Sequence, residues 1–298
     1  MGAAAAVSFQ RAGYRTLLWL RDRQKIGAAE QTLFDLAAWM QTHVGPPLST
    51  SGRTDVVSEL SALDAKADVV LDCIAEVMED KVSLFNNLPK ARTRQALFLT
   101  TTSGLSITQL GRLSETGPML AGTHFWNPPH LMPLVEVIRG QETRDDVIDR
   151  AVALIESLGK IAVRVERDVP GFIGNRLLHA MWREAIHLIQ SGIASPTDVD
   201  RVARLTFGLR LPAVGPLENM DLVGLDLVRT IHDYLLADLA GDLQPQPLLN
   251  AKVQGGTIGM KSGLGFYDWQ ARDPGALVDR RDRQIVRQLD FLREIDAL

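Results

Sequence analysis

"MGAAAAVSFQRAGYRTLLWLRD", residues 1–22, is the stretch that decides how this chain folds. Gly2 opens a run of small apolar residues, and Ala12-Gly13 marks a turn before the apolar residues 16–20, which have the length of a buried strand. This order is typical of the first helix and second strand of a nucleotide-binding α/β unit, although a plain alanine-rich helix without a ligand is an alternative. In a nucleotide-binding unit a strand and two glycines come before that helix, and no such residues stand ahead of Gly2.

Composition and charge exclude several classes of protein. The 298 residues are 46% hydrophobic and 23% charged, with a net charge of −4, which is ordinary for a soluble globular protein. Acids and bases are mixed along the chain, so we expect no nucleic-acid partner. No apolar run reaches the ~20 residues of a membrane helix, and residues 3–7 lack the basic residues of a secretory signal. With a single cysteine, Cys73, a cytoplasmic protein without disulfides is expected.

Short apolar runs alternate with helical stretches up to about residue 165. Helices separate these runs, for example over residues 80–88 and 144–158, while residues 23–60 look like a long helical excursion. The alternation predicts a mostly parallel sheet covered by helices. After Asp168 the strands stop, so the second domain is predicted to be mainly helical. The predicted strands are residues 16–20, 69–74, 96–101, 119–125, 134–138 and 162–165, and the later predicted helices are residues 175–190, one that begins after a Ser195 cap, and residues 222–239.

Three polar residues stand where neighbouring segments can bring them into a site. His124 closes one apolar run and Glu136 lies inside the next. On adjacent strands they would form a general base and a carboxylate that orients the imidazole and stabilises its protonated form, with a purely structural pairing as the alternative. Asn175 begins a predicted helix, where it can bind a substrate or cap the helix.

Four motifs together resemble the 3-hydroxyacyl-CoA dehydrogenase family, which also includes sugar-acid dehydrogenases and lens lambda-crystallin. The motifs are "GTHFWNPPHLMPLVEVI", "DVPGFIGNRLL", "GPLENMDLVGLD" and "GMKSGLGFYDW", and they occur in the family's order and spacing. The resemblance implies an NAD-binding Rossmann-like α/β domain over residues 1–166, followed by an all-α domain over residues 167–298 that contributes to the substrate cleft and to dimerisation. It also implies oxidation of an L-3-hydroxyacyl-CoA to a 3-oxoacyl-CoA with hydride transfer to NAD.

The resemblance also implies roles for individual residues. His124 matches the catalytic base and Glu136 its partner, while Ser103 and Asn175 match residues that hold the reacting oxygen. The positions that match cofactor contacts are Gly2, Asp22, Glu76, Lys81, Ser103, Asn127 and Lys261. No spacing of the histidines indicates a metal site, although His130 lies close to the loop that follows the catalytic histidine.

Two departures from the family pattern concern the cofactor. The family begins with a strand and two glycines that this chain lacks, so we expect a sheet without one central strand, with the edges of its neighbours exposed. The family's ribose-binding acid falls on Leu20, with Arg21 next and Asp22 two residues late. Asp22 would serve NAD, whereas Arg21 would accommodate the 2′-phosphate of NADP. We expect NAD and leave NADP open.

The sequence is compatible with three functions. The first is an NAD-dependent dehydrogenase of a short- or medium-chain L-3-hydroxyacyl-CoA. The second is a dehydrogenase of a 3-hydroxy acid such as L-gulonate or carnitine, because residues 23–60 carry no readable CoA-binding signature. The third is a truncated pseudoenzyme that keeps the fold without binding cofactor, which the absent strand favours.

Overall fold

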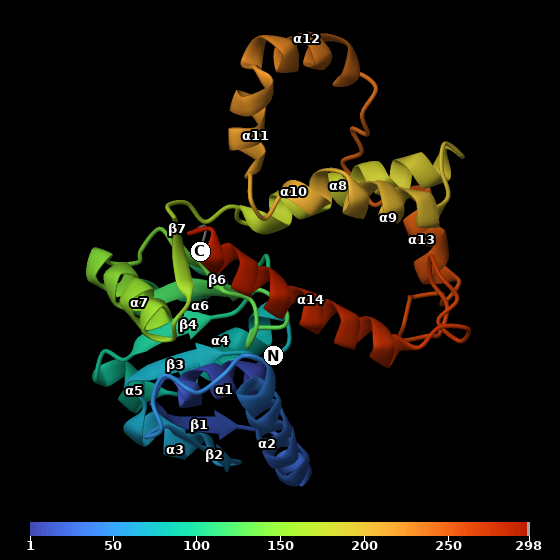
Figure 1. Ribbon diagram of the computed structural model, residues 1–298. Helices are drawn as coiled ribbons and strands as arrows, with labels where there is room; N and C mark the ends of the chain where they lie inside the picture. The colour runs from blue at the N-terminus through green and yellow to red at the C-terminus, as the bar shows by residue number, and fades with distance from the viewer. Residues whose placement is uncertain (297–298) are drawn as a thin grey trace. The chain divides into compact units, whose positions relative to one another are not determined.

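The computed structural model describes residues 1–296, which form two compact units: Met1–Arg176, and a second unit that begins at Leu177. The first unit alternates helices and strands, and the second is helical (Figure 1). The elements of the first unit are α1 (Gly2–Arg11), β1 (Arg15–Trp19), η1 (Arg23–Lys25), α2 (Ile26–His43), β2 (Arg53–Val57), α3 (Leu60–Lys66), β3 (Val69–Asp72), α4 (Met78–Asn86), α5 (Pro89–Thr93), β4 (Leu97–Thr100), α6 (Ile107–Leu113), η2 (Gly117–Met119), β5 (Leu120–Phe125), β6 (Leu134–Arg139), α7 (Asp145–Ser157) and β7 (Ile161–Val165).

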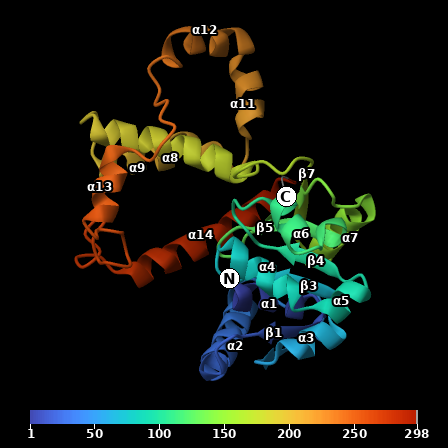
Figure 2. The same cartoon turned by 180° about the vertical axis from the view of Figure 1, so that it is seen from behind.

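The strands form a mostly parallel α/β arrangement, as the sequence predicted. A five-stranded sheet has the order β3-β4-β5-β6-β7, in which only the β5–β6 pair is antiparallel. All six predicted strands are present within about two residues of their expected ends. Helices cover both faces: residues of α1 and α7 pack on one face, and residues of α4, α5 and α6 pack on the other (Figures 1 and 2).

One strand was missed. The prediction that residues 23–60 form a helical excursion is wrong in its last part, because β2 lies there and pairs in parallel with β1. Its sequence, RTDVV, carries two charged residues and ends in only two apolar ones, so it has no strand-like run of apolar residues. β2 is recognisable only from its partner, because Arg15 aligns with Arg53 and Trp19 with Val57.

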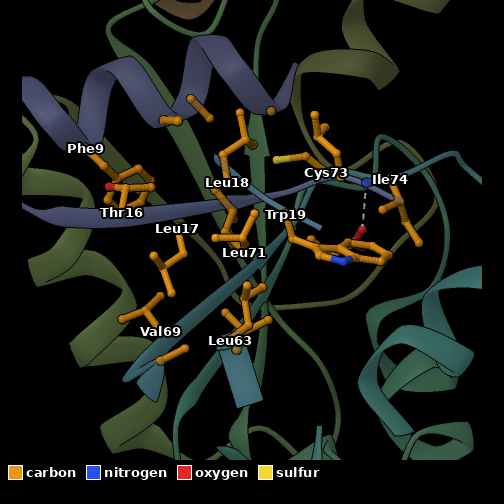
Figure 3. A pocket seen from close by; sticks show the side chains of 18 of the residues that line it. Phe9, Thr16, Leu17, Leu18, Trp19, Leu63, Val69, Leu71, Cys73 and Ile74 are labelled. Atoms are coloured by element: carbon orange, nitrogen blue, oxygen red, sulfur yellow. Dashed lines mark hydrogen bonds between the residues drawn. The ribbon is translucent and has the colours of Figure 1, made fainter. Parts of the chain in front are cut away.

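The sheet is interrupted between β1 and β3. β1 pairs only with β2, and β3 pairs only with β4, so each has one edge without a neighbouring strand among the described residues. A cavity of about 970 Å³ lies between them, lined by apolar side chains such as Leu17, Leu18 and Leu71 (Figure 3). The half-buried thiol of Cys73 also lines it, and burial together with the nearby Asp72 carboxylate raises the pKa of Cys73 to about 11. These two unpaired edges agree with the prediction of a sheet that lacks one central strand.

The second unit consists of helices, of which α8, α9 and α12 are strongly amphipathic, and α8 starts in the first unit. Ser195 caps α9 by accepting a hydrogen bond from the N–H of Asp198, as the sequence predicted. The single helix predicted over residues 222–239 is instead two helices, because Gly224, with φ +103°, ends the first of them. Nowhere in residues 1–296 is a helix both long enough and apolar enough to span a bilayer. The helices are α8 (Gly174–Gln190), α9 (Pro196–Leu205), α10 (Phe207–Arg210), α11 (Pro216–Val223), α12 (Leu225–Leu235), α13 (Pro247–Gln254) and α14 (Pro274–Glu294).

Candidate active site

The histidine and glutamate singled out in the sequence lie on neighbouring strands of the first unit. β5 and β6 are joined by residues 126–133, which we call the proline loop, and run antiparallel so that His124 stands opposite Glu136. His124 Nδ1 lies 2.7 Å from Glu136 Oε2, and both side chains are buried. The strand register therefore brings together two residues that the sequence placed only on adjacent apolar runs.

Glu136 also holds the start of α8. Its other carboxylate oxygen, Oε1, accepts hydrogen bonds from the backbone N–H groups of Ile173 at 2.9 Å and Gly174 at 3.0 Å. Burial by itself raises the pKa of Glu136, but the hydrogen bonds from His124, Gly174 and Ile173 outweigh it and leave the pKa below its ordinary value. Because a carboxylate can only accept hydrogen bonds, His124 Nδ1 carries a proton, and in the neutral imidazole Nε2 is then the nitrogen with a lone pair. His124 Nε2 can therefore act as a base.

Aromatic rings surround the imidazole of His124. The ring centroids of Trp126 and Phe172 lie 4.9 Å and 5.7 Å from that of the imidazole. Position 174 requires glycine, because a Cβ there would collide with the Trp126 ring. Phe172 is fully buried and has a positive φ of 51°, which is uncommon for a bulky residue. The segment from Phe172 to Gly174 is thus fixed closely beside the histidine.

Ser103, Asn175 and Glu76 form a second cluster, which belongs to the same unit. The side-chain amide of Asn175 donates to the Ser103 carbonyl oxygen at 2.9 Å. Glu76 Oε1 accepts from the backbone N–H groups of Ser103 at 2.8 Å and Gly104 at 3.3 Å, and from the Thr102 hydroxyl. The side chain of Ser103 is exposed, and its hydroxyl makes no hydrogen bond to any of the residues that the structure describes. That hydroxyl is therefore available to a ligand.

A buried ion pair lies next to Glu76. The Lys81 side chain is fully buried, donates to Asp72 Oδ2 at 2.8 Å and lies 3.7 Å from Glu76 Oε2. Asp72 also accepts from the Thr100 hydroxyl at 2.7 Å and from the Ile74 N–H at 2.9 Å. Lys81 thus connects the end of β3 to the segment that carries Glu76. Sequence reasoning missed Asp72, although an acid at the end of a buried strand, nine residues before a lysine, is a usable signal.

The first turn of α1 suits an anionic ligand. Gly2 begins this helix and lines the cavity between β1 and β3. Within the described part of the chain, no side chain caps this turn and no acidic residue stands in it. Its backbone N–H groups are therefore free to bind an anion, which fits the pyrophosphate of a dinucleotide.

Arg21 and Asp22, which follow β1, make different contacts. The Asp22 carboxylate caps η1 by accepting from the Gln24 N–H at 3.0 Å, and Asp22 does not line the cavity. Arg21 does line the cavity, and its guanidinium lies 3.8 Å from the Asp80 carboxylate. In this structure Asp22 therefore stabilises a turn, and its contact with a ribose stays a prediction.

The remaining predicted contacts lie on exposed segments. Asn127 is exposed in the proline loop, where its bond to Pro128 is cis. Lys261 is exposed in the second unit, between α13 and α14. His130 packs edge-on against Trp39, with ring centroids 6.1 Å apart. Across residues 1–296, no group of three His, Cys, Asp or Glu side chains is arranged to hold a metal ion.

Comparison with known families matches both parts of the chain. Residues 1–169 match the family model described as the 3-hydroxyacyl-CoA dehydrogenase NAD binding domain. Residues 171–269 match the model described as the 3-hydroxyacyl-CoA dehydrogenase C-terminal domain. The two matches follow one another and together span most of the chain.

Known proteins resemble the chain in sequence and in structure. A probable 3-hydroxybutyryl-CoA dehydrogenase of Bacillus subtilis is 39% identical over 207 residues, which are 69% of this chain and 71% of that protein. The 5-formyl-3-hydroxy-2-methylpyridine 4-carboxylate 5-dehydrogenase of Mesorhizobium japonicum is 28% identical over 96% of this chain and 93% of its own. A crystal structure of an enzyme of that name, described as an NAD⁺-dependent dismutase, superposes with a TM-score of 0.93 at 27% identity, covering 98% of this chain and 95% of that one. The 3-hydroxybutyryl-CoA dehydrogenase of Escherichia coli superposes with a TM-score of 0.72 at 31% identity, covering 91% of this chain and 58% of that one.

Proposed function

This chain belongs to the 3-hydroxyacyl-CoA dehydrogenase family, and from that premise we propose that it oxidises a short- or medium-chain L-3-hydroxyacyl-CoA to the 3-oxoacyl-CoA with NAD. The observation that carries the proposal is the buried His124–Glu136 pair, with its imidazole Nε2 left as an acceptor. The reaction removes the proton of the 3-hydroxyl while the hydride leaves the carbon that carries this hydroxyl. It therefore requires a base such as the His124 imidazole. Run in reverse, the same site reduces a 3-oxoacyl thioester.

Four residues of the chain have separate roles in the proposed reaction. Bound NAD supplies the acceptor for the hydride. His124 Nε2 takes the proton of the 3-hydroxyl, and the positive charge that then forms on the imidazole is offset by Glu136 at 2.7 Å. The Ser103 hydroxyl and the Asn175 amide hold the oxygen as it becomes a carbonyl. Glu136, fixed by the N–H groups of α8, keeps the imidazole in one orientation.

The proposed cofactor contacts come from several segments of the chain. Gly2 and the free first turn of α1 support a pyrophosphate site. Glu76 orders the backbone at Ser103, and the buried Lys81 acts through Glu76. The further proposed contacts are Asp22, Ser103, Asn127 and Lys261.

A second candidate substrate is an aromatic aldehyde that also carries a carboxylate. The TM-score of 0.93 to the pyridine-carboxylate dehydrogenase, against 0.72 to the Escherichia coli 3-hydroxybutyryl-CoA dehydrogenase, favours it. A base that takes a proton from a hydroxyl serves equally for an alcohol and for the hydrate of an aldehyde, because both lose a hydroxyl proton and a hydride from one carbon. The His124–Glu136 pair is therefore common to both candidates.

One set of assays separates these candidates. The rate at which the full chain forms NADH from NAD is measured with each of four substrates. They are 3-hydroxybutyryl-CoA, 5-formyl-3-hydroxy-2-methylpyridine 4-carboxylate, L-gulonate and carnitine. The proposal expects the CoA thioester to have a kcat/KM at least about tenfold above the others. Preference for the pyridine aldehyde would establish the second candidate instead, and preference for L-gulonate or carnitine would indicate a 3-hydroxy acid.

NADH titration tests the alternative of a pseudoenzyme. The intact site residues lead us to expect fluorescence changes that saturate below about 1 mM NADH. No binding at millimolar cofactor would remove the dehydrogenase proposal for this chain. The same titration with NADPH tests the part played by Arg21 beside the cavity.

A further inference from the structure

A buried lysine outside the catalytic cluster holds the proline loop. Lys160 is 9% exposed, and its Nζ donates hydrogen bonds to the carbonyl oxygens of Pro129 and Met132, each at 2.8 Å. The next residue, Ile161, donates its backbone N–H to the Pro133 carbonyl oxygen at 2.8 Å. Three hydrogen bonds from two consecutive residues therefore fix three carbonyl groups of one loop.

Lys160 itself is set between two rigid elements. α7 ends just before it, and Gly159, with φ +71°, closes the helix by donating its N–H to the Glu156 carbonyl oxygen at 2.9 Å. β7 then begins at Ile161, which aligns with Leu134 of β6. The backbone of Lys160 is thus held on both sides, so its ammonium reaches the proline loop from a fixed point.

The ammonium of Lys160 is buried without a carboxylate partner among the described residues. Burial lowers its pKa to about 8, so it is mostly protonated at neutral pH. A methionine or leucine would fill this space without burying a charge. What lysine adds is a pair of charge-assisted hydrogen bonds to two carbonyl groups that no strand satisfies.

The proline loop connects this lysine to the site. Its first residue, Trp126, packs on the imidazole of His124, and its second, Asn127, is the exposed residue matched to a cofactor contact. We propose that Lys160 is a positioning residue, which fixes the proline loop and thereby holds Asn127 where the dinucleotide binds. The effect on the dinucleotide rests on the proposed function, whereas the fixing of the loop does not.

The test compares Lys160→Met with Lys90→Met, which removes an exposed lysine of the same unit. The first readout is amide hydrogen exchange at Leu131 and Met132, whose N–H groups bond to the Pro128 carbonyl oxygen at 3.0 Å. In Lys160→Met this exchange is expected to be at least about tenfold faster, since charge-assisted hydrogen bonds that close the loop are lost. The second readout is NADH affinity, expected to weaken by about tenfold, with KM for NAD rising while kcat at saturating NAD stays within about twofold.

The controls decide between positioning and simple stabilisation. Lys160→Arg keeps a charge and several donors and is expected to restore both readouts to within about twofold of the natural chain. A merely structural lysine would lower the melting temperature while leaving NADH affinity and KM for NAD unchanged, which would overturn the proposal. If Lys160→Met does not fold, Lys160→Gln takes its place, and normal exchange at Leu131 in that variant would equally overturn it. Should the natural chain oxidise none of the substrates, the exchange readout still tests Lys160 while the proposed function fails.

Discussion

The carboxylate of Glu136 connects the His124 side chain to the start of α8, because both of its oxygens accept hydrogen bonds. One oxygen accepts from His124, and the other accepts from two N–H groups at the start of α8. The orientation of the His124 imidazole is therefore tied to the position of residues 173 and 174, which Asn175 follows directly. At the scale of residues, a substitution of His124 or Glu136 is expected to lower activity more than it lowers the stability of the fold.

His124→Gln is expected to lower kcat by about 10²- to 10⁴-fold, because the amide cannot take the hydroxyl proton. The dissociation constant for NADH should stay within about twofold, since the base acts on the substrate and not on the cofactor. Steady-state kinetics and NADH fluorescence titration measure the two effects. A variant that kept more than about a tenth of the activity would remove His124 from the role of base.

Lys160 predicts an unusual dependence of stability on pH. Its pKa is about 8 in the folded chain against an ordinary 10.5, so between these values the unfolded chain binds the proton that the folded chain has lost. The free energy of unfolding of the natural chain, relative to Lys160→Met, should therefore be constant below pH 8 and rise above it. The shift from 10.5 to about 8 corresponds to a rise of up to about 3 kcal/mol by pH 10.5. Urea denaturation from pH 7 to 10 measures it, and a difference that fell with pH would contradict the assignment.

At the scale of elements, β1 and β3 present their unpaired edges to one cavity. The side chains around it are largely apolar (Figure 3). Gly2, the first residue of α1, also lines it. Unpaired strand edges and an apolar cavity both cost stability, because backbone groups lack partners and apolar surface stays open.

An added strand is therefore expected to fill the cavity. Placing an apolar segment of about five residues and a Gly-x-Gly turn ahead of Gly2 should raise the melting temperature by about 5 °C, since two strand edges gain a partner. Cys73 should react more slowly with thiol reagents, and NADH should bind more tightly. A matched extension with two prolines in the segment lacks the N–H donors of a strand and is the control. Equal effects from both extensions would show that the cavity does not accept a strand.

At the scale of the whole molecule, the second unit leaves much apolar surface uncovered. Helices α8 to α13 contain no buried residue, although their apolar side chains gather on one side of several of them. Leu209, Leu217 and Leu222 are each more than 70% exposed. Exposed apolar surface of this extent is typical of an interface. The homodimer expected from the sequence stays a prediction, and these helices support it.

Sedimentation of the purified chain is expected to give twice the mass of the 32.8 kDa monomer at micromolar concentration. Replacing Val202 of α9 and Leu222 of α11 by aspartate should shift the mass toward the monomer, because a buried charge in an apolar interface lacks a partner. Asp221→Asn, next to Leu222, is the matched control. A natural chain that sedimented as a monomer would contradict the prediction.

Local patterns were sufficient for several features of this protein. Runs of apolar residues located six strands, and the polar residues within two of these runs pointed to His124 and Glu136. Ser195 was recognised as a cap because capping depends on residues within one helical turn. These features depend on neighbours in the sequence, so the sequence by itself determined them, together with the family to which the chain belongs.

Only the tertiary structure decided which distant groups pair. It joined Glu136 to the N–H groups at 173 and 174, Lys81 to Asp72, and Lys160 to the proline loop. It also formed β2, whose polar residues become a strand only beside β1. The physical reason is that a buried polar group needs a hydrogen-bond partner. The register and order of the strands decide which residue, often far away in the sequence, becomes that partner. The split sheet follows the same principle, since the gap lies between β1 and β3, two strands that are far apart in the sequence and that only the fold brings near each other.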